Sequence, residues 1–415
     1  MSGDQKANKK GMLSHIALYA VGVAAIALGF LISVFCGILV TILAAIVWFF
    51  RKQILQNRPL MVSLVAVILG LLAGAVLMVA IGNDPFTSFY YLFSGGLKTI
   101  QRFGGSIASA IPLVLTGLSV AFAFRTGLFN IGGAGQMLIG GLAATCVALW
   151  LPLPKFLVLP IMFVAAILGG GLWAAVPGVL KAKFNVHEVV STIMMNWVAY
   201  WAVYYFVPAY LKSNLETESR TIPMTASLQV QWLTDLFGGS DSFMNLGIFI
   251  ALGAIVLIAF ILNRTVMGYE LKAVGFNRHS AEYAGMPVNR NIMLSMTIAG
   301  ALAGLAGFAQ YCGYASNMSI GSLPSQGYDG IAVALLGVNA PWGVAVAAMF
   351  FGILQNGKGF MSAATSVPPD IADTIIAVII YFAATSVLIE RAWDWLSRRK
   401  AQKAKGEALG NVGNH

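Results

Sequence analysis

Seven amide and aromatic residues interrupt long apolar stretches of the 415-residue sequence, where they could contact a solute. Amide side chains both donate and accept hydrogen bonds, and aromatic rings offer flat faces for stacking. The set therefore predicts a path for an uncharged solute that forms hydrogen bonds. For each amide, the alternative is a hydrogen bond between two helices. The seven residues are Asn130, Gln136, Asn196, Trp197, Tyr200, Gln310 and Tyr311.

Acidic residues are missing from the centres of the long apolar stretches. Asp329, Asp370 and Asp373 are expected near the outer ends of the last segments, and Glu188 at the inner end of another. A carrier driven by protons or ions generally needs a titratable or ion-binding group deep in the membrane. The sequence therefore indicates that another protein supplies the energy for transport.

Two motifs resemble enzyme sites, but each lacks a required residue. The segment 352–359 nearly matches a phosphate-binding loop, yet Gly359 stands where Ser or Thr would bind Mg²⁺. His187 and Glu188 begin like a zinc-protease motif, yet Ser191 stands where the second His belongs. Since four His and three Cys form no ligand cluster in the sequence, we expect neither an enzyme nor a metal or other cofactor.

The composition excludes a water-soluble protein. Hydrophobic residues make up 59% of the chain and charged residues only 10%, whereas soluble domains carry about 25% charge. The net charge of +10 could indicate a nucleic-acid partner. A multi-pass membrane protein explains it better, because cytoplasmic loops collect Lys and Arg. We therefore expect membrane lipid around the chain and no nucleic acid.

The apolar pattern predicts an all-α, multi-pass membrane protein with about twelve crossings and both termini inside. Residues 15–50 are predicted as an N-terminal hairpin, with a cleaved signal peptide as the alternative. The pieces 328–338 and 343–357 are short and are expected to be half-helices that meet inside the protein. The expected parts are 1–58 (tail and hairpin), 59–390 (transmembrane domain) and 391–415 (cytoplasmic basic tail). The other predicted spans are 60–81, 105–125, 127–150, 156–180, 189–210, 243–262, 291–312 and 371–389.

Two polar stretches stand out from the apolar background. Residues 126–136 are rich in glycine, which permits either an unwound helix that lines a cavity or close packing of helices. Residues 263–291 form the longest polar inside loop, with helix-like parts bounded by glycines. A short amphipathic helix around 277–284 would suit docking into a partner's groove, and a plain solvated connector is the alternative.

These stretches resemble the transmembrane permease subunits of bacterial ABC importers, in the class that includes ribose and branched-chain amino-acid permeases. The resemblance extends from about Leu60 to Glu390. The form Gly-Leu-Phe-Asn-Ile-Gly at 127–132, followed by Gln136, is similar to the nucleoside-uptake subgroup. Related sequences often have an acidic residue where this chain has Ala134. The segments that carry the resemblance are 127–141, 181–196, 268–290 and 328–337.

The resemblance implies an ABC permease core of about ten helices in the bacterial plasma membrane. It implies two cytoplasmic ATPase subunits, a second and paralogous permease subunit, and an extracytoplasmic substrate-binding lipoprotein. The chain would form half of a path for purine or pyrimidine nucleosides. The alternatives are a simple sugar or another small polar solute in the same class, or a stand-alone secondary transporter. The residues that would couple the spans to the ATPase are Glu270, Gly275, Asn277, Ala281, Ala284 and Gly285.

Overall fold

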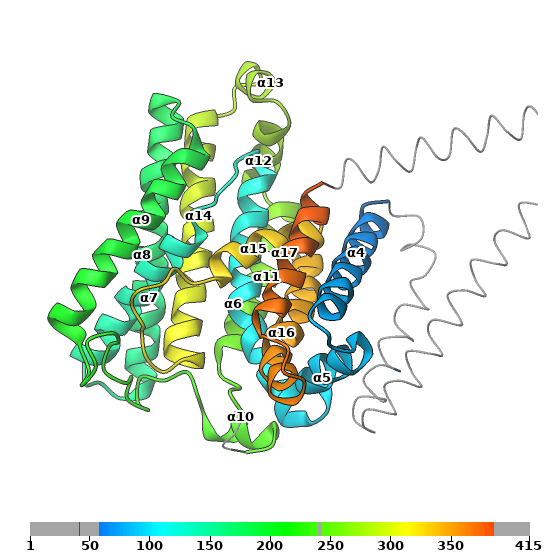
Figure 1. Cartoon of the computed structure of the whole chain (residues 1–415). Helices are drawn as coiled ribbons and strands as arrows, with labels where there is room; N and C mark the ends of the chain where they lie inside the picture. Colours follow the sequence, from blue (N-terminus) through cyan, green and yellow to red (C-terminus); the bar gives the residue numbers. More distant parts are fainter. Residues whose placement is uncertain (1–40, 42–57, 240–241, 386–415) are drawn as a thin grey trace, which may run out of the picture.

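The computed structural model describes residue 41 and residues 58–239 and 242–385. The predicted hairpin at 15–50 and the basic tail from 391 onward lie outside these residues, so both remain predictions. The described chain forms a bundle of helices (Figure 1). The helices are α4 (Arg58–Ala80), α5 (Pro85–Leu97), α6 (Ile100–Arg125), α7 (Gly133–Trp150), α8 (Lys155–Phe184), α9 (Glu188–Phe206), α10 (Gln231–Leu236), α11 (Gly247–Arg264), α12 (Val266–Phe276), α13 (Arg278–Tyr283), α14 (Val288–Ala309), α15 (Gln326–Leu336), α16 (Pro341–Ala364) and α17 (Asp370–Ala384).

Each of the ten spans predicted after residue 58 corresponds to a helix, which confirms an all-α, multi-pass membrane protein. Seven described helices are long and apolar enough to cross a membrane. Helix α9 has 19 residues but is not among the seven. Helix α15, with 11 residues, is about 16 Å long and cannot cross about 30 Å of hydrocarbon.

The structure corrects four boundaries that the sequence predicted. Residues 127–132 are not helical, so the predicted span 127–150 begins only at Gly133. The piece 343–357 is no half-helix, because α16 continues for 24 residues and spans alone. Its polar residues have partners: Asn356 Nδ2 donates to Arg102 O at 2.8 Å. Gly268 and Gly275 lie inside α12 rather than at its ends. Helix α6 begins at Ile100 rather than at the predicted 105. Helix α5, in a stretch for which no span was predicted, begins where Asp84 accepts hydrogen bonds from the backbone N–H groups of its first turn.

The phosphate-loop-like segment 352–359 lies wholly inside α16, so its glycines form no loop around a phosphate. Gly352 packs against the backbone of α6, and Gly357 packs against Leu92 O of α5. A Cβ at either position would clash with backbone atoms. Small residues here therefore let helix backbones approach closely, as is usual in membranes.

The centre of the bundle is a crossing of α8 and α14 that depends on glycine. Gly170 and Gly304 face each other there, and Gly140 of α7 packs against Gly304 from another side. A Cβ at Gly304 would meet Ala166 O and the backbone of Gly170. Since each of these contacts is made by backbone atoms, a side chain at Gly304 could be accommodated only by moving a helix.

Helices α7 to α9 and α15 to α17 form two similarly connected groups. Helix α7 packs against α8, α9 and α14, and α15 packs against α16, α17 and α6 in the corresponding way. The glycine-rich stretch at 126–136 leads into α7, and a second glycine-containing start, at Gly327 and Gly330, lies at the corresponding place in α15. Helices α7 and α15 begin side by side, because Gly133 lies against Gly327 O and Gly327 lies against Ala134. Repeats that meet at the middle of a membrane are typical of transporters.

Basic residues mark one end of the bundle. Helices α6, α8 and α11 all end in Arg or Lys, at the end where α12 and α13 lie. Helix α10 lies at the opposite end (Figure 1). The positive-inside rule assigns the end with α12 and α13 to the cytoplasm. Among its described residues, 211–239 and 242, the loop on the outer side contains one α-helix, the six-residue α10.

Candidate functional site

Three of the seven predicted path residues form one buried hydrogen-bonded cluster at the start of α7. Asn130 Nδ2 donates to Gln136 Oε1 at 2.9 Å, and Gln136 Nε2 donates back to Asn130 Oδ1 at 3.0 Å. The same Asn130 oxygen accepts from Gly132 N at 3.0 Å. Asn130, Gln136 and Asn196 are all at most 1% exposed. Their amide groups therefore bond to the protein itself, and none of the three lies on the surface of this chain.

Asn196 connects this cluster to two other helices. Its Oδ1 accepts from Gly135 N at 2.8 Å, which satisfies a backbone donor in the first turn of α7. Its Nδ2 donates to Ile131 O at 3.0 Å and to the Tyr328 hydroxyl at 3.4 Å. Asn196 lies about 12 Å along α9 from Glu188, near the middle of that helix. The starts of α7 and α15 are thus held at mid-depth.

The exposed side of α9 differs from that of an ordinary lipid-facing helix. Trp197 is half exposed, and its ring makes an edge contact with Tyr200 at 5.6 Å between centroids. Tyr200 in turn stacks on Tyr204 at 6.0 Å, and Trp201 lies against both tyrosines. Trp and Tyr normally gather at the two membrane interfaces, but Trp197 lies at the middle of the helix. We call the side chains of Trp197, Tyr200, Trp201 and Tyr204 the aromatic face.

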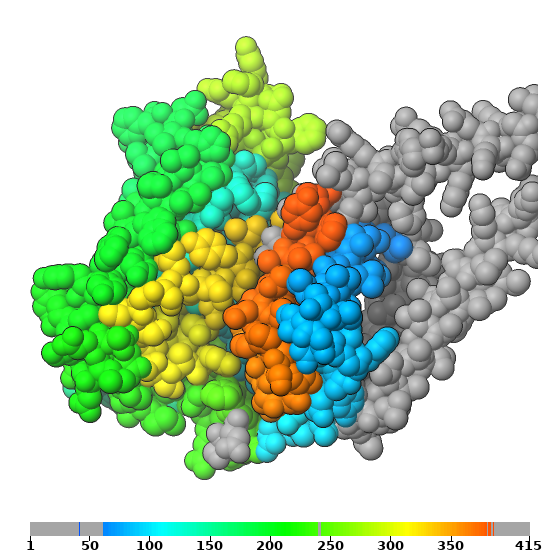
Figure 2. Space-filling view, in the orientation of Figure 1, coloured from blue at the N-terminus to red at the C-terminus, as the bar shows by residue number. Residues whose placement is uncertain are grey.

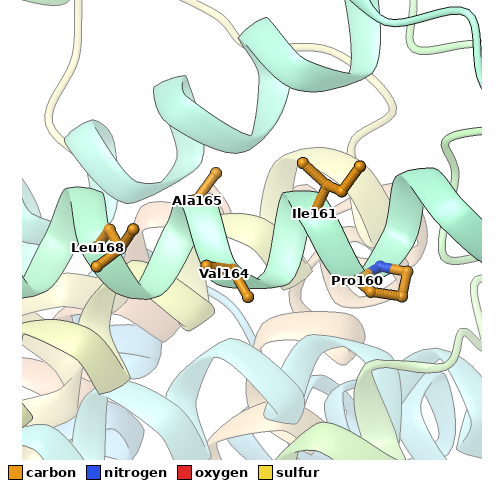
Figure 3. A pocket seen from close by; sticks show the side chains of 5 residues that line it. All are labelled: Pro160, Ile161, Val164, Ala165 and Leu168. Carbon is orange, nitrogen blue, oxygen red and sulfur yellow. The ribbon is translucent and has the colours of Figure 1, made fainter.

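Helix α8 shows what a lipid-facing surface of this protein looks like. A shallow groove on it is lined by Pro160, Ile161, Val164, Ala165 and Leu168, all from this one helix (Figure 3). None of these side chains carries a polar atom. The groove suits acyl chains and offers nothing to a polar solute. The exposed side of α8 is therefore aliphatic here, whereas that of α9 carries tryptophan and tyrosine rings.

The last two predicted path residues lie in the π-helical turn Gln310–Tyr314 that continues α14. Tyr311 is buried, and its ring occupies the space that the missing side chain of Gly141 leaves free. It packs with Leu138 and Val203 in an apolar cluster. Gln310 is partly buried. Tyr311 therefore joins α14 to α7 and α9 and is not at the surface.

The predicted docking helix around 277–284 exists as α13, which Asn277 caps by accepting from Ser280 N at 3.1 Å. Ala281 is buried, and Ala284 and Gly285 are exposed at its end, where Gly285 takes a φ of 78°. Phe276 and Tyr283 are each 95% exposed beside them. The groove between α12 and α13 is lined by Tyr269, Lys272, Ala273, Phe276, Asn277, Ser280, Ala281, Ala284 and Met286. We call this set the docking surface.

The remaining two predicted coupling residues, Glu270 and Gly275, lie between the docking surface and the spans. Glu270 Oε2 accepts from Asn291 Nδ2 of α14 at 3.0 Å. Gly275 packs against Arg125 O, at the end of α6, and against Gly127. Gly127 has a φ of 70° and begins the non-helical segment that leads to Asn130. Helix α12 is therefore in contact with the segment that holds the start of α7.

One charged group lies deeper than the sequence predicted. Asp329 Oδ2 accepts from Gln355 Nε2 at 3.4 Å, and Gln355 is about 13 Å from the outer end of α16. Nearby, Lys358 Nζ pairs with Asp373 at 2.9 Å. The prediction that Asp329 lies at the outer end of a span is wrong, because α15 begins inside the protein. Hydropathy alone could not locate that start.

Comparison with known proteins assigns this architecture to a family. Residues 103–384 match the family described as the permease component of the branched-chain amino acid transport system. The chain belongs to this permease family. The match covers α6 to α17, and so includes the amide cluster, the aromatic face and the docking surface. It confirms a multi-pass permease of the plasma membrane and a transport subunit rather than an enzyme.

Relatives within the permease family extend over most of the chain. It is 42% identical to the guanosine ABC transporter permease protein NupP of Bacillus subtilis, over 82% of this chain and 98% of that protein. It is 36% identical to the nucleoside ABC transporter permease protein NupB of Lactococcus lactis, over 84% and 96%. It is 30% identical to the glucose ABC transporter permease protein TsgB13 of Haloferax volcanii, over 83% and 92%. No solved structure matches the chain.

Proposed function

We propose that the chain is a permease subunit of an ATP-driven importer and forms half of a path for nucleosides. The observation that carries this proposal is the aromatic face, which presents tryptophan and tyrosine rings at the middle of α9, where Trp197, Trp201 and Tyr204 are exposed on this chain. Aromatic rings and hydroxyls suit a flat base joined to a ribose. The names of NupP and NupB support the same solute class.

The aromatic face is exposed on this chain and is where a partner subunit would pack. A second, paralogous permease on that side would close the path between the two subunits, with the substrate passing along α9. The buried cluster of Asn130, Gln136 and Asn196 then acts behind the path. It holds the start of α7 in place while the aromatic face contacts the solute.

The docking surface is where the motor would bind. Two ATPase subunits would contact the permease pair from the cytoplasm, one on each docking surface, with Phe276 and Tyr283 as aromatic anchors. Closure would pass through Glu270 and Gly275 to α14 and α6. An extracytoplasmic lipoprotein would deliver the solute to the opposite end, near α10.

A competition assay tests the solute class. Cells that express the full importer take up a labelled nucleoside in the presence of unlabelled nucleosides, free bases, ribose or glucose. We expect nucleosides to compete at least about tenfold better than either sugar, because a site built for a base loses that binding with a bare sugar. Equal competition by glucose would indicate that the chain transports a sugar, as the name of TsgB13 states for that protein. Cells that lack the ATPase subunits serve as the blank.

A further inference from the structure

The start of α15 lies on a surface that lipid cannot cover. Residues 315–325 connect the outer turn of α14 to α15 without helical structure. The first part pairs with the outer loop, where Ser219 N donates to Met318 O at 2.9 Å. The part that leads from there to the start of α15 is 321–325, in which Gly321, Ser322 and Ser325 are exposed. The region around α15, in yellow to gold, is at the surface between the green helices and the orange α16 and α17 (Figure 2). Non-helical backbone at membrane depth is tolerated only inside protein or beside a water-filled cavity. This surface therefore faces the path.

Tyr328 is the aromatic residue that α15 contributes to this surface. It stands in the first turn of the helix, between the buried glycines Gly327 and Gly330, and is itself 37% exposed. Its hydroxyl is 3.4 Å from Asn196 Nδ2. Asn196 precedes Trp197 on α9, so Tyr328 lies at the same depth as the aromatic face.

The hydrogen bond with Asn196 determines what the Tyr328 hydroxyl offers. The amide nitrogen can only donate, so the phenol oxygen is the acceptor and its own hydrogen remains to be donated. Within 58–239 and 242–385, no acceptor for that hydrogen is found among the protein's own groups. Asn196 is fixed in turn by Gly135 N and Ile131 O. The Tyr328 hydroxyl is thus positioned by Asn196, and its hydrogen is available for a hydrogen bond to a solute that contacts the exposed Tyr328 ring.

We propose that Tyr328 is a specificity-determining residue of the permease, which stacks on the base of the passing nucleoside and donates a hydrogen bond to a carbonyl oxygen or ring nitrogen. This inference rests on the proposed function and adds to it a selection by the permease itself. Stacking on an aromatic ring is stronger for the larger base, so the residue favours purine over pyrimidine nucleosides.

The test uses the full importer in proteoliposomes, with uptake of inosine and of uridine measured per assembled complex. We expect Tyr328→Phe, which keeps the ring, to lower inosine uptake about threefold to tenfold, the effect of one hydrogen bond. We expect Tyr328→Leu to lower inosine uptake by at least about tenfold and uridine uptake by less. A change in the inosine-to-uridine ratio is a result that a merely structural role would not give.

Tyr90→Leu is the matched control, because Tyr90 is also 37% exposed but lies on α5, away from the path. It should leave both uptake rates and the ATPase rate unchanged. If wild type takes up inosine and Tyr328→Leu lowers both solutes equally, or neither, the inference is overturned and the proposed function stands. If the wild-type importer takes up neither nucleoside, both are overturned.

Discussion

Replacing Phe276 with Asp should separate the permease from its motor. We expect the ATPase subunits to be lost from the purified complex and uptake to fall by at least about 100-fold. Phe276 is 95% exposed on the docking surface, so removing its ring cannot damage the core of the free chain. In the assembled importer, Asp at this position would be a buried, unpaired charge, which weakens binding by about 2–5 kcal/mol. A loss of about 2.7 kcal/mol of binding free energy corresponds to a 100-fold lower affinity.

The measurement is co-purification of the ATPase subunits with tagged permease, followed by uptake in proteoliposomes. Phe86→Asp is the control, since Phe86 is 86% exposed on α5, at the opposite end of the bundle from α13. It should retain the full amount of ATPase. Normal ATPase recovery and normal uptake with Phe276→Asp would show that the motor binds elsewhere.

Replacing Gly304 with Val should unfold the centre of the bundle. The new side chain would collide with Ala166 O and with the backbone of Gly170, which are parts of helix α8. Overpacking a core typically lowers the free energy of unfolding by about 1–3 kcal/mol. Because the new side chain meets backbone atoms that cannot move aside, we expect Gly304→Val to lower it by about 3 kcal/mol or more. We expect the amount of folded protein in membranes to fall severely and the thermal midpoint of any purified protein to drop.

Gly253→Val controls for the change from glycine to a β-branched residue within a helix. Gly253 lies in α11, where a Cβ would meet nothing within 4 Å. Its variant should accumulate to wild-type levels and unfold at the wild-type temperature or above it. If Gly304→Val behaved in the same way, the close crossing of α8 and α14 would not exist in the membrane.

The sequence predicted the helices well and the surfaces poorly, for physical reasons. Long apolar runs such as α8 are determined by hydropathy alone, and so were found with good boundaries. Helix α15 is short because its start is held by Asn196 and Gly133, which lie far away along the chain. No local pattern carries that information.

Residue type alone did not predict which side chains are buried. An amide in an apolar segment can face a path or another helix, and here Asn130 and Gln136 satisfy each other. Phe276 and Tyr283 were missed because residue type alone does not distinguish an exposed aromatic ring from a buried one. Tyr328 stood in a recognised motif, yet only its exposed ring and its bond to Asn196 suggest a role.

Asp329 raises the question of whether protons or ATP drive transport through this protein. It is a carboxyl group at membrane depth, and such groups serve proton coupling in other transporters. We propose instead that ATPase subunits bound to the docking surface supply the energy. The two mechanisms differ in what the isolated chain can do.

The most direct test is uphill uptake of a labelled nucleoside into vesicles. In one arm, the permease pair is reconstituted with its ATPase subunits, the lipoprotein and ATP. In the other, the purified chain is reconstituted without them, under an imposed proton or sodium gradient. We expect accumulation only in the first arm, unchanged when ionophores collapse the gradients and absent when the ATPase cannot hydrolyse ATP. Accumulation by the chain alone, driven by either gradient, would contradict the account.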